Sequence, residues 1–546
     1  MATDVGGPSG RRWVVTRGVA GAAVLIGAIT VLARITGFAK QAVFAGTVGT
    51  NCLGTAYATA NQIPNIVFEV VVGGALAGMV VPVLAGAAGR AQVGRITSAL
   101  LTWVLVVLVP LAVLTAVLAG PVMGLFSFVG CDAAAVSALA TRMLVVFAPQ
   151  IPLYGLAVVL YGVLQSHQRF AGPAVAPLVS SIVVIVAYLL FVPLSGDTRD
   201  PGTLPTPAEL ALSVGTSLGV LALVLTVTGP ALGLRLRLRP TLRFPEGVAA
   251  QVRALAMAGI AGLLAQQATM VVVLLLSNNA IGGGALVVYN YAWAIYLVPY
   301  AVLAVPIATS AFPGLSAHAA GQAWEPFAAL AARTTRAVVL VSGLAAGALA
   351  AAAGPGAVVF LRSLTDVPPP ELARAIALFA PGLIGYGLIA HLSRVLYAAG
   401  RGRAAATGTV VGWVVAMLAQ VGFVLAFPEG WQVGGLALGM TAGMTVGGAW
   451  LLAAVARARG AEPVQGVARA TLAAFAGGGA GFAAGSALVA LIPATGLLAL
   501  TGLALLAGCV ALAVGAAVVA LVDRADAAAL AGIVLRRRRD ESRMGG

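Results

Sequence analysis

The chain is 546 residues long, 61% of its residues are hydrophobic, 9% are charged, and its formal net charge is +15. About a quarter of the residues of an ordinary soluble domain are charged. Composition therefore excludes a soluble globular protein and indicates a chain whose apolar surface needs lipid.

Apolar runs recur along the whole chain and predict an all-α polytopic membrane protein. Cutting the sequence at charges and at Pro or Gly clusters leaves about fourteen runs that can cross roughly 30 Å of hydrocarbon at 1.5 Å per residue. They are longer and more continuously apolar than the alternating ten-residue strands of a membrane β-barrel. The predicted helices begin near residues 18, 53, 96, 134, 170, 208, 249, 284, 330, 371, 403, 432, 466 and 496.

Basic residues are concentrated in every second loop between these runs. The basic loops hold Arg90 and Arg95, Arg169, Arg235 to Arg253, Arg333 and Arg336, Arg394 to Arg403, and Arg457 to Arg469. Lys and Arg favour cytoplasmic loops. The pattern therefore predicts a bacterial cell membrane protein with both termini in the cytoplasm, and it explains the positive charge without a nucleic-acid partner.

A sequence repeat relates the two halves of the chain. Phe147-Ala148-Pro149 recurs 232 residues later as Phe379-Ala380-Pro381, and Tyr154-Gly155-Leu156 recurs at the same interval as Tyr386-Gly387-Leu388. The interval covers six predicted helices, an even number, so both copies have the same orientation in the membrane. We expect two six-helix bundles that face each other across a central cavity, followed by two additional helices.

The repeat also sets the expected division of the chain. The expected parts are an N-terminal tail (1–17), an N-lobe (18–240), a C-lobe (241–460), a C-terminal helix pair (461–523) and a basic tail (524–546).

Five polar residues within predicted spans are candidates for substrate binding: Arg34, Lys40, Asn65, Glu69 and Arg142. A carboxylate at the depth of Glu69 costs at least about 2.5 kcal/mol and must face protein or water. Arg34 and Lys40 lie near the predicted outer end of the first span, against the charge pattern of the loops. Cations in that part of a cavity suit an anionic headgroup, although Lys40 could instead extend to the outer lipid headgroups, and Glu69 could be a structural residue.

The sequence shows no pattern typical of a metal site, a redox site or an enzyme active site. Cys52, Cys131 and Cys509 show no metal or redox spacing, and we interpret them as small apolar residues. The sequence contains no recognisable nucleophile–base set, carboxylate pair or phosphate-binding loop. We therefore predict neither an enzyme nor a bound metal or cofactor.

Several segments resemble the MurJ (MviN) family, most closely its actinobacterial members, and the resemblance extends over nearly the whole chain at low identity. The segments are Arg34 to Phe38, Ala60 to Glu69, Gly73 to Leu84, Val163 to Ala174 and Arg394 to Ala398. The family belongs to the multidrug, oligosaccharidyl-lipid and polysaccharide exporter superfamily. The resemblance implies transfer of lipid II, the undecaprenyl-diphosphate-linked peptidoglycan precursor, to the outer leaflet by alternating access. It implies lipid II, membrane lipids and cell-wall synthesis or divisome proteins as partners.

Family-based roles match this chain only in part. Cationic residues of the first span serve the diphosphate in the family, and Arg34 and Lys40 occupy those positions. Thr55 stands where members usually have Asp, Phe68 and Glu69 replace an arginine pair, and Ala294 replaces a cavity Arg. The carboxylates of a sodium site are also missing from the seventh and eleventh spans.

Two other functions stay open at the level of sequence. One is a MATE-like drug or metabolite antiporter, or another polysaccharide-lipid exporter of the same superfamily. A cationic drug needs acidic cavity residues, and the one carboxylate, Glu69, is set against at least two cations. The other is a non-transporting scaffold, which has no use for charges within the membrane.

Overall fold

The computed structural model describes residues 29, 32–70, 80, 83–84, 89–245, 248–361, 365–526 and 528. These residues are almost entirely helical and contain no β-strand, although Thr50 and Thr365 form one isolated bridge. The prediction of an all-α membrane protein is confirmed.

Helices long and apolar enough to cross a membrane number 11 within the described residues, or 12 when a pair bent by 43° counts as one span. They coincide with the third to fourteenth predicted helices. The first predicted helix begins before the described residues, and the second continues beyond residue 70 into residues that are not described. The total of fourteen therefore stays a prediction.

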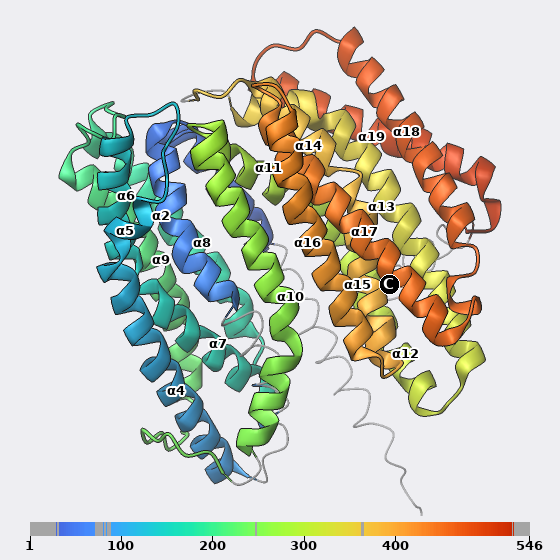
Figure 1. Cartoon of the computed structure of the whole chain (residues 1–546), viewed down its shortest axis with the longest axis horizontal. Helices are drawn as coiled ribbons and strands as arrows, with labels where there is room; N and C mark the ends of the chain where they lie inside the picture. Colours follow the sequence, from blue (N-terminus) through green and yellow to red (C-terminus); the bar gives the residue numbers. More distant parts are fainter. Residues whose placement is uncertain are drawn as a thin grey trace, which may run out of the picture.

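Two lobes lie side by side in Figure 1, and each contains one copy of the repeat. The N-terminal lobe consists of α2 (Cys52–Phe68), α4 (Arg90–Val117), α5 (Ala119–Met123), α6 (Ala133–Phe147), α7 (Gln150–Ser166), α8 (Ala171–Ser195) and α9 (Thr206–Leu232). The C-terminal lobe consists of α10 (Val248–Leu276), η2 (Ser277–Ile281), α11 (Ala285–Pro299), η3 (Tyr300–Ala304), α12 (Val305–Ala320), α13 (Trp324–Phe360), α14 (Pro369–Phe379), α15 (Gly382–Ala398), α16 (Gly402–Ala426) and α17 (Gln432–Arg459).

The repeated tripeptides break a helix at the same point in both lobes. Phe147 ends α6 and Phe379 ends α14, and the following prolines precede α7 and α15, which are both 17 residues long. The glycine of the second repeated triplet has the same role twice. A Cβ atom at Gly155 would clash with Leu108 of α4, and one at Gly387 would lie 2.9 Å from Val338 of α13. The close approach of helices that these glycines permit explains why they recur, and the two parallel copies are confirmed.

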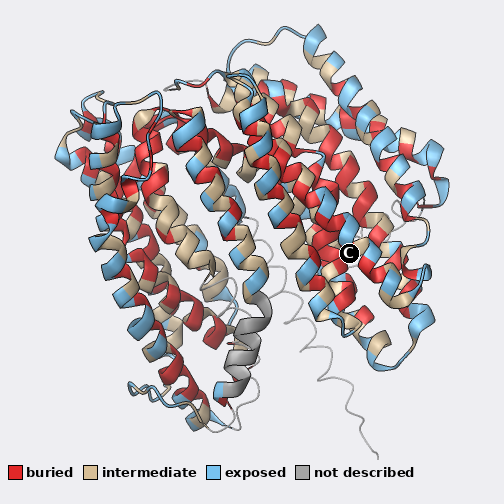
Figure 2. Ribbon diagram, in the orientation of Figure 1, coloured by how far each residue is buried: buried red, intermediate tan, exposed pale blue. Residues whose placement is uncertain are grey.

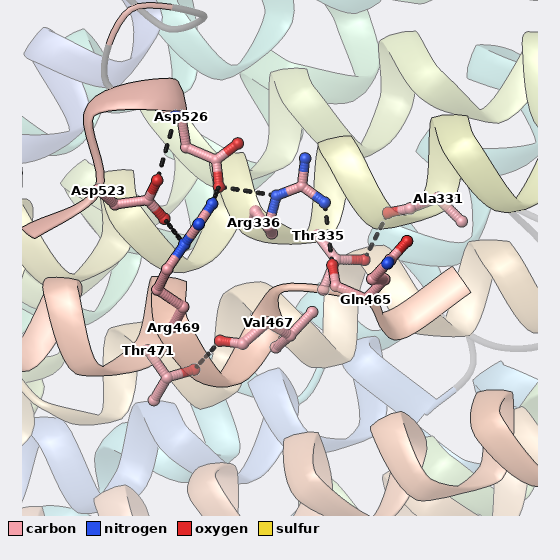
Figure 3. A network of polar contacts seen from close by, with 9 residues as sticks. All are labelled: Ala331, Thr335, Arg336, Gln465, Val467, Arg469, Thr471, Asp523 and Asp526. Atoms are coloured by element: carbon pink, nitrogen blue, oxygen red, sulfur yellow. Dashed lines mark hydrogen bonds and ion pairs between the residues drawn. The ribbon is translucent and has the colours of Figure 1, made fainter. Parts of the chain in front are cut away.

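A C-terminal helix pair, α18 (Val467–Leu491) and α19 (Leu497–Val522), packs on α13 at the outside of the C-terminal lobe. Figure 3 shows the charged network at one end of the pair. Arg336 of α13 donates to Asp526 at 2.7 Å, and Arg469 of α18 donates to Asp523 at 2.9 Å. Because both carboxylates follow α19, the ion pairs attach all three helices to one another.

Exposed apolar side chains mark the surface that lipid covers. Figure 2 shows buried residues concentrated between the packed helices of each lobe. Large apolar residues such as Val113 and Val117 of α4 and Leu498 and Leu505 of α19 point outward. Backbone polar groups of these helices are satisfied internally, which allows apolar surroundings.

Candidate functional site: the cavity between the lobes

Two chambers of about 270 and 250 Å³ lie between the lobes. Both are lined by Gln62 and Asn65 of α2 and by Asn290 and Trp293 of α11. The four shared residues make the chambers parts of one cavity, with the N-terminal lobe on one side and the C-terminal lobe on the other.

Among the described residues, Lys40 is the only charged residue that lines the first chamber. No ion pair to Lys40 occurs within the described part of the chain. Tyr57 forms the adjacent wall, where its hydroxyl lies 2.8 Å from both the Tyr188 hydroxyl and Thr216 Oγ1. As far as the described residues go, the first chamber is therefore a polar space whose single cation has no ion-pair partner, which suits an anion.

The helix that carries Lys40, over residues 32–47, is held between the lobes. Phe44 packs on Tyr188 of the N-terminal lobe with ring centroids 5.1 Å apart, and Phe38 packs on Phe360 of the C-terminal lobe at 5.2 Å. Arg199 donates to the carbonyl oxygen of Thr47 at 3.1 Å, which satisfies the C-terminal end of the helix. These contacts fix where Lys40 stands.

The second chamber is lined mainly by neutral polar and aromatic side chains. Within the part of the chain that the structure describes, Glu69 is its only charged residue. Helix α10 contributes Gln266 and Gln267, and Tyr289 and Trp413 contribute rings. Lys40 and Glu69 line different chambers, and no ion pair joins them within the described residues.

Three of the five predicted site residues, Lys40, Asn65 and Glu69, line the cavity, and the other two do not line either chamber. Arg34 is exposed. Arg142 binds Glu209 of α9 through three hydrogen bonds of 2.8 to 3.1 Å. This ion pair lies inside the N-terminal lobe and gives Arg142 a structural partner that the sequence did not indicate.

Most residues of the cavity wall were not predicted from the sequence, because they are uncharged and the candidates were chosen mainly by charge. The missed residues are amides and aromatics, and they include Asn61, Gln62, Gln266, Gln267, Asn290 and Trp293. Their signal was the presence of amides within apolar runs, since an amide facing lipid without a partner is costly. Ala294 does line the first chamber, so the position at which the family carries arginine still faces the cavity.

The lobes are joined at one end of the cavity, which we call the closed end and which lies at the top of Figure 1. Gly284 N donates to Thr55 Oγ1 at 2.7 Å, and the Asn278 amide donates to Thr59 Oγ1 at 3.1 Å. Gly284 has a φ of +81°, a conformation that glycine adopts without strain. Thr55, the position at which the family usually has Asp, is thus part of this junction.

Loops on both sides extend the junction. Ser127 N donates to Asn279 Oδ1 at 2.6 Å, Val129 N donates to the Asn278 carbonyl at 3.0 Å, and Asp366 N donates to the Thr50 carbonyl at 3.1 Å. Access through the closed end therefore requires several hydrogen bonds between the lobes to break.

A disulfide bond between Cys52 and Cys131 braces the N-terminal side of the closed end. It joins the first residue of α2 to the loop before α6, with the Cα atoms 5.8 Å apart. The interpretation of these cysteines as small apolar residues is wrong. The residues are 79 positions apart, and pairing across such a separation has no local sequence signal. Cys509 is free and exposed.

Comparison with known proteins agrees with this architecture. The family model for the lipid II flippase MurJ matches residues 44–501. A lipid II flippase MurJ from Burkholderia cenocepacia is 28% identical over 394 residues, which cover 69% of this chain and 73% of that protein.

Solved structures share the fold at lower identity. A lipid II flippase MurJ in an inward closed conformation superimposes with a TM-score of 0.70 at 17% identity, covering 91% of this chain and 99% of that one. An inward-facing MATE family transporter of the MOP superfamily gives a TM-score of 0.63 at 16% identity, covering 80% and 98%. Because the family model covers most of the sequence, this multi-pass membrane protein belongs to the lipid II flippase MurJ family.

Proposed function

We propose that this protein moves lipid II from the cytoplasmic to the outer leaflet of the bacterial cell membrane by alternating access. The observation that carries the proposal is Lys40, a cation without an ion-pair partner among the described residues, in a cavity between two parallel lobes that are joined at one end. Family membership supports the choice of lipid II as substrate.

Lys40 supplies the charge that a diphosphate needs. Two unit charges about 4 Å apart attract by about 4 kcal/mol at an effective dielectric constant of about 20. The headgroup enters from the cytoplasmic leaflet, its lipid tail stays in the bilayer, and the lobes then rock to expose the cavity on the other side. Arg34 is a second proposed cation for the diphosphate, and Asn65 is a proposed hydrogen-bonding residue.

Opening of the closed end has a cost that substrate binding can offset. A typical hydrogen bond contributes about 0.5–1.5 kcal/mol net, so the junction between the lobes amounts to a few kcal/mol. A ligand shifts a conformational equilibrium by its difference in affinity for the two states. A headgroup that binds more tightly to the conformation in which the closed end has opened supplies this difference in affinity.

We infer that the closed end faces outside and that both termini are cytoplasmic. Disulfides persist in oxidising compartments, and the Cys52–Cys131 bond lies at this end. Arg95, near the start of α4, and Arg169, between α7 and α8, lie at the opposite ends of their helices, as the positive-inside pattern requires. Cell-wall synthesis or divisome proteins are proposed partners on the basis of the family.

Lys40→Met tests the proposed role of the cation. We expect the variant to insert normally but to fail to rescue growth and lipid II flipping in a flippase-depleted strain, because the diphosphate loses its counter-charge. Lys40→Arg is the matched control and retains at least part of the activity. Full rescue by Lys40→Met would contradict the proposed function of this site.

A MATE-like antiporter is the second candidate, and Glu69 in the second chamber is the observation that favours it. A cationic substrate would depend on that carboxylate, whereas an anionic headgroup would not. We expect Glu69→Gln to retain lipid II flipping. Loss of export of a cationic dye by Glu69→Gln, with no effect of Lys40→Met on that export, would favour the antiporter.

A further inference from the structure

The second chamber contains a concentration of amide side chains from three helices. Asn65 comes from α2, Gln266 and Gln267 come from α10, and Asn290 comes from α11. Gln267 is 5% exposed, and the other three are partly buried. Nearby, the Oδ1 atom of Asn61, which lines the first chamber, is buried without a hydrogen-bond partner among the described residues.

Aromatic rings accompany these amides. Trp293 lines both chambers, and Tyr289 and Trp413 line the second. The Trp293 ring stacks on Tyr296 with centroids 5.3 Å apart and an interplanar angle of 27°. This contact holds Trp293 in place at the boundary of the chambers.

The Glu69 carboxylate disfavours a phosphate in the second chamber, whereas the amides and rings there match the chemistry of a sugar. Each amide offers both donors and an acceptor, which match the hydroxyl and acetamido groups of an amino sugar, and ring faces cover its C–H surface. A phosphate in this chamber would be repelled by the Glu69 carboxylate. A purely apolar ligand would leave the buried amides unpaired, which costs about 1–3 kcal/mol for each group.

We propose that the second chamber is the glycan subsite, which binds the sugars of the headgroup while Lys40 in the first chamber binds the diphosphate. This rests on the proposed function, because it assigns the two parts of one substrate to two parts of one cavity. Asn65 and Asn290 stand where the chambers meet. The arrangement sets the direction in which the headgroup lies, with its sugars toward α10 and its diphosphate toward residues 32–47.

Binding of two probes to purified full-length protein tests the subsite. The probes are undecaprenyl diphosphate, which has no sugar, and lipid II. For Gln266→Ala and Gln267→Ala, whose side chains line the second chamber and not the first, we expect lipid II to bind about tenfold more weakly, as for the loss of about 1.4 kcal/mol. Binding of undecaprenyl diphosphate stays within about twofold of wild type. Gln432→Ala, an amide of α17 that lines neither chamber, is the matched control and binds both probes normally.

Ring variants provide a second measurement that does not depend on the amides. Trp293→Leu should lose the preference for lipid II, and Trp293→Phe should retain much of it, with equal melting temperatures for the two proteins. Equal weakening of both probes by the amide variants, or no weakening of either, would overturn the glycan subsite. Failure of wild-type protein to bind either probe would instead overturn the proposed function on which it rests.

Discussion

At the scale of single residues, a charge within the membrane indicates function or structure according to its partner. Lys40 and Glu69 line a cavity and have no ion-pair partner among the described residues, whereas Arg142 is bound to Glu209. From sequence alone the three are equivalent, since each is an ionisable group within an apolar run. Only the packing of α6 against α9 separates Arg142 from the others.

The Arg142–Glu209 pair is expected to stabilise the N-terminal lobe. The Glu209 side chain is 12% exposed, so Arg142→Met leaves an almost buried carboxylate without its partner. Because Arg142 itself is half-exposed, we expect a loss of about 1–3 kcal/mol, below the range for fully buried pairs. Replacing both residues, as Arg142→Met with Glu209→Leu, should restore most of the melting temperature in detergent.

The same double variant separates the structural role from the substrate-binding role first expected for Arg142. Retained lipid II flipping by a stable double variant would assign Arg142 to structure. A stable double variant that has lost flipping would return Arg142 to the substrate site.

At the scale of elements, the helices were predictable and their long-range contacts were not. Starts near residues 134, 403 and 432 agree with α6, α16 and α17 within two residues, because apolar length and flanking charges determine where a membrane helix can lie. The Phe-Ala-Pro break was also visible in the repeat. The disulfide and the amide wall depend on which helices become neighbours, and local sequence patterns do not predict helix neighbours.

The disulfide provides a direct test of orientation. In cells expressing a Cys509→Ala variant, a membrane-impermeant phosphine should reduce the Cys52–Cys131 bond, after which an impermeant maleimide labels both cysteines. Without the phosphine, no label is expected, since both thiols are oxidised. Labelling that requires permeabilised cells would place the closed end in the cytoplasm and contradict the proposed topology. An N-ethylmaleimide label added to lysed, reduced cells is the control for total thiol.

At the scale of the whole molecule, the parallel repeat explains how one cavity is made from two similar lobes. The even number of helices in the repeat predicted two bundles of the same orientation, and equivalent breaks at Phe147 and Phe379 confirm it. The repeat does not predict which end of the cavity is closed. That depends on contacts between non-equivalent segments, such as Thr55 with Gly284, and so on the conformation that the chain adopts.

If the lobes must separate at the closed end during transport, a covalent link there should stop it. Thr50 and Thr365 form a bridge between the lobes, so the double variant Thr50→Cys/Thr365→Cys should form a disulfide on oxidation. We expect the oxidised double variant to lose lipid II flipping in vesicles and to regain it on reduction. Wild-type protein is the matched control, because its own disulfide lies within one lobe and leaves the lobes free to move. Undiminished flipping by fully cross-linked protein would show that the substrate does not pass through this end.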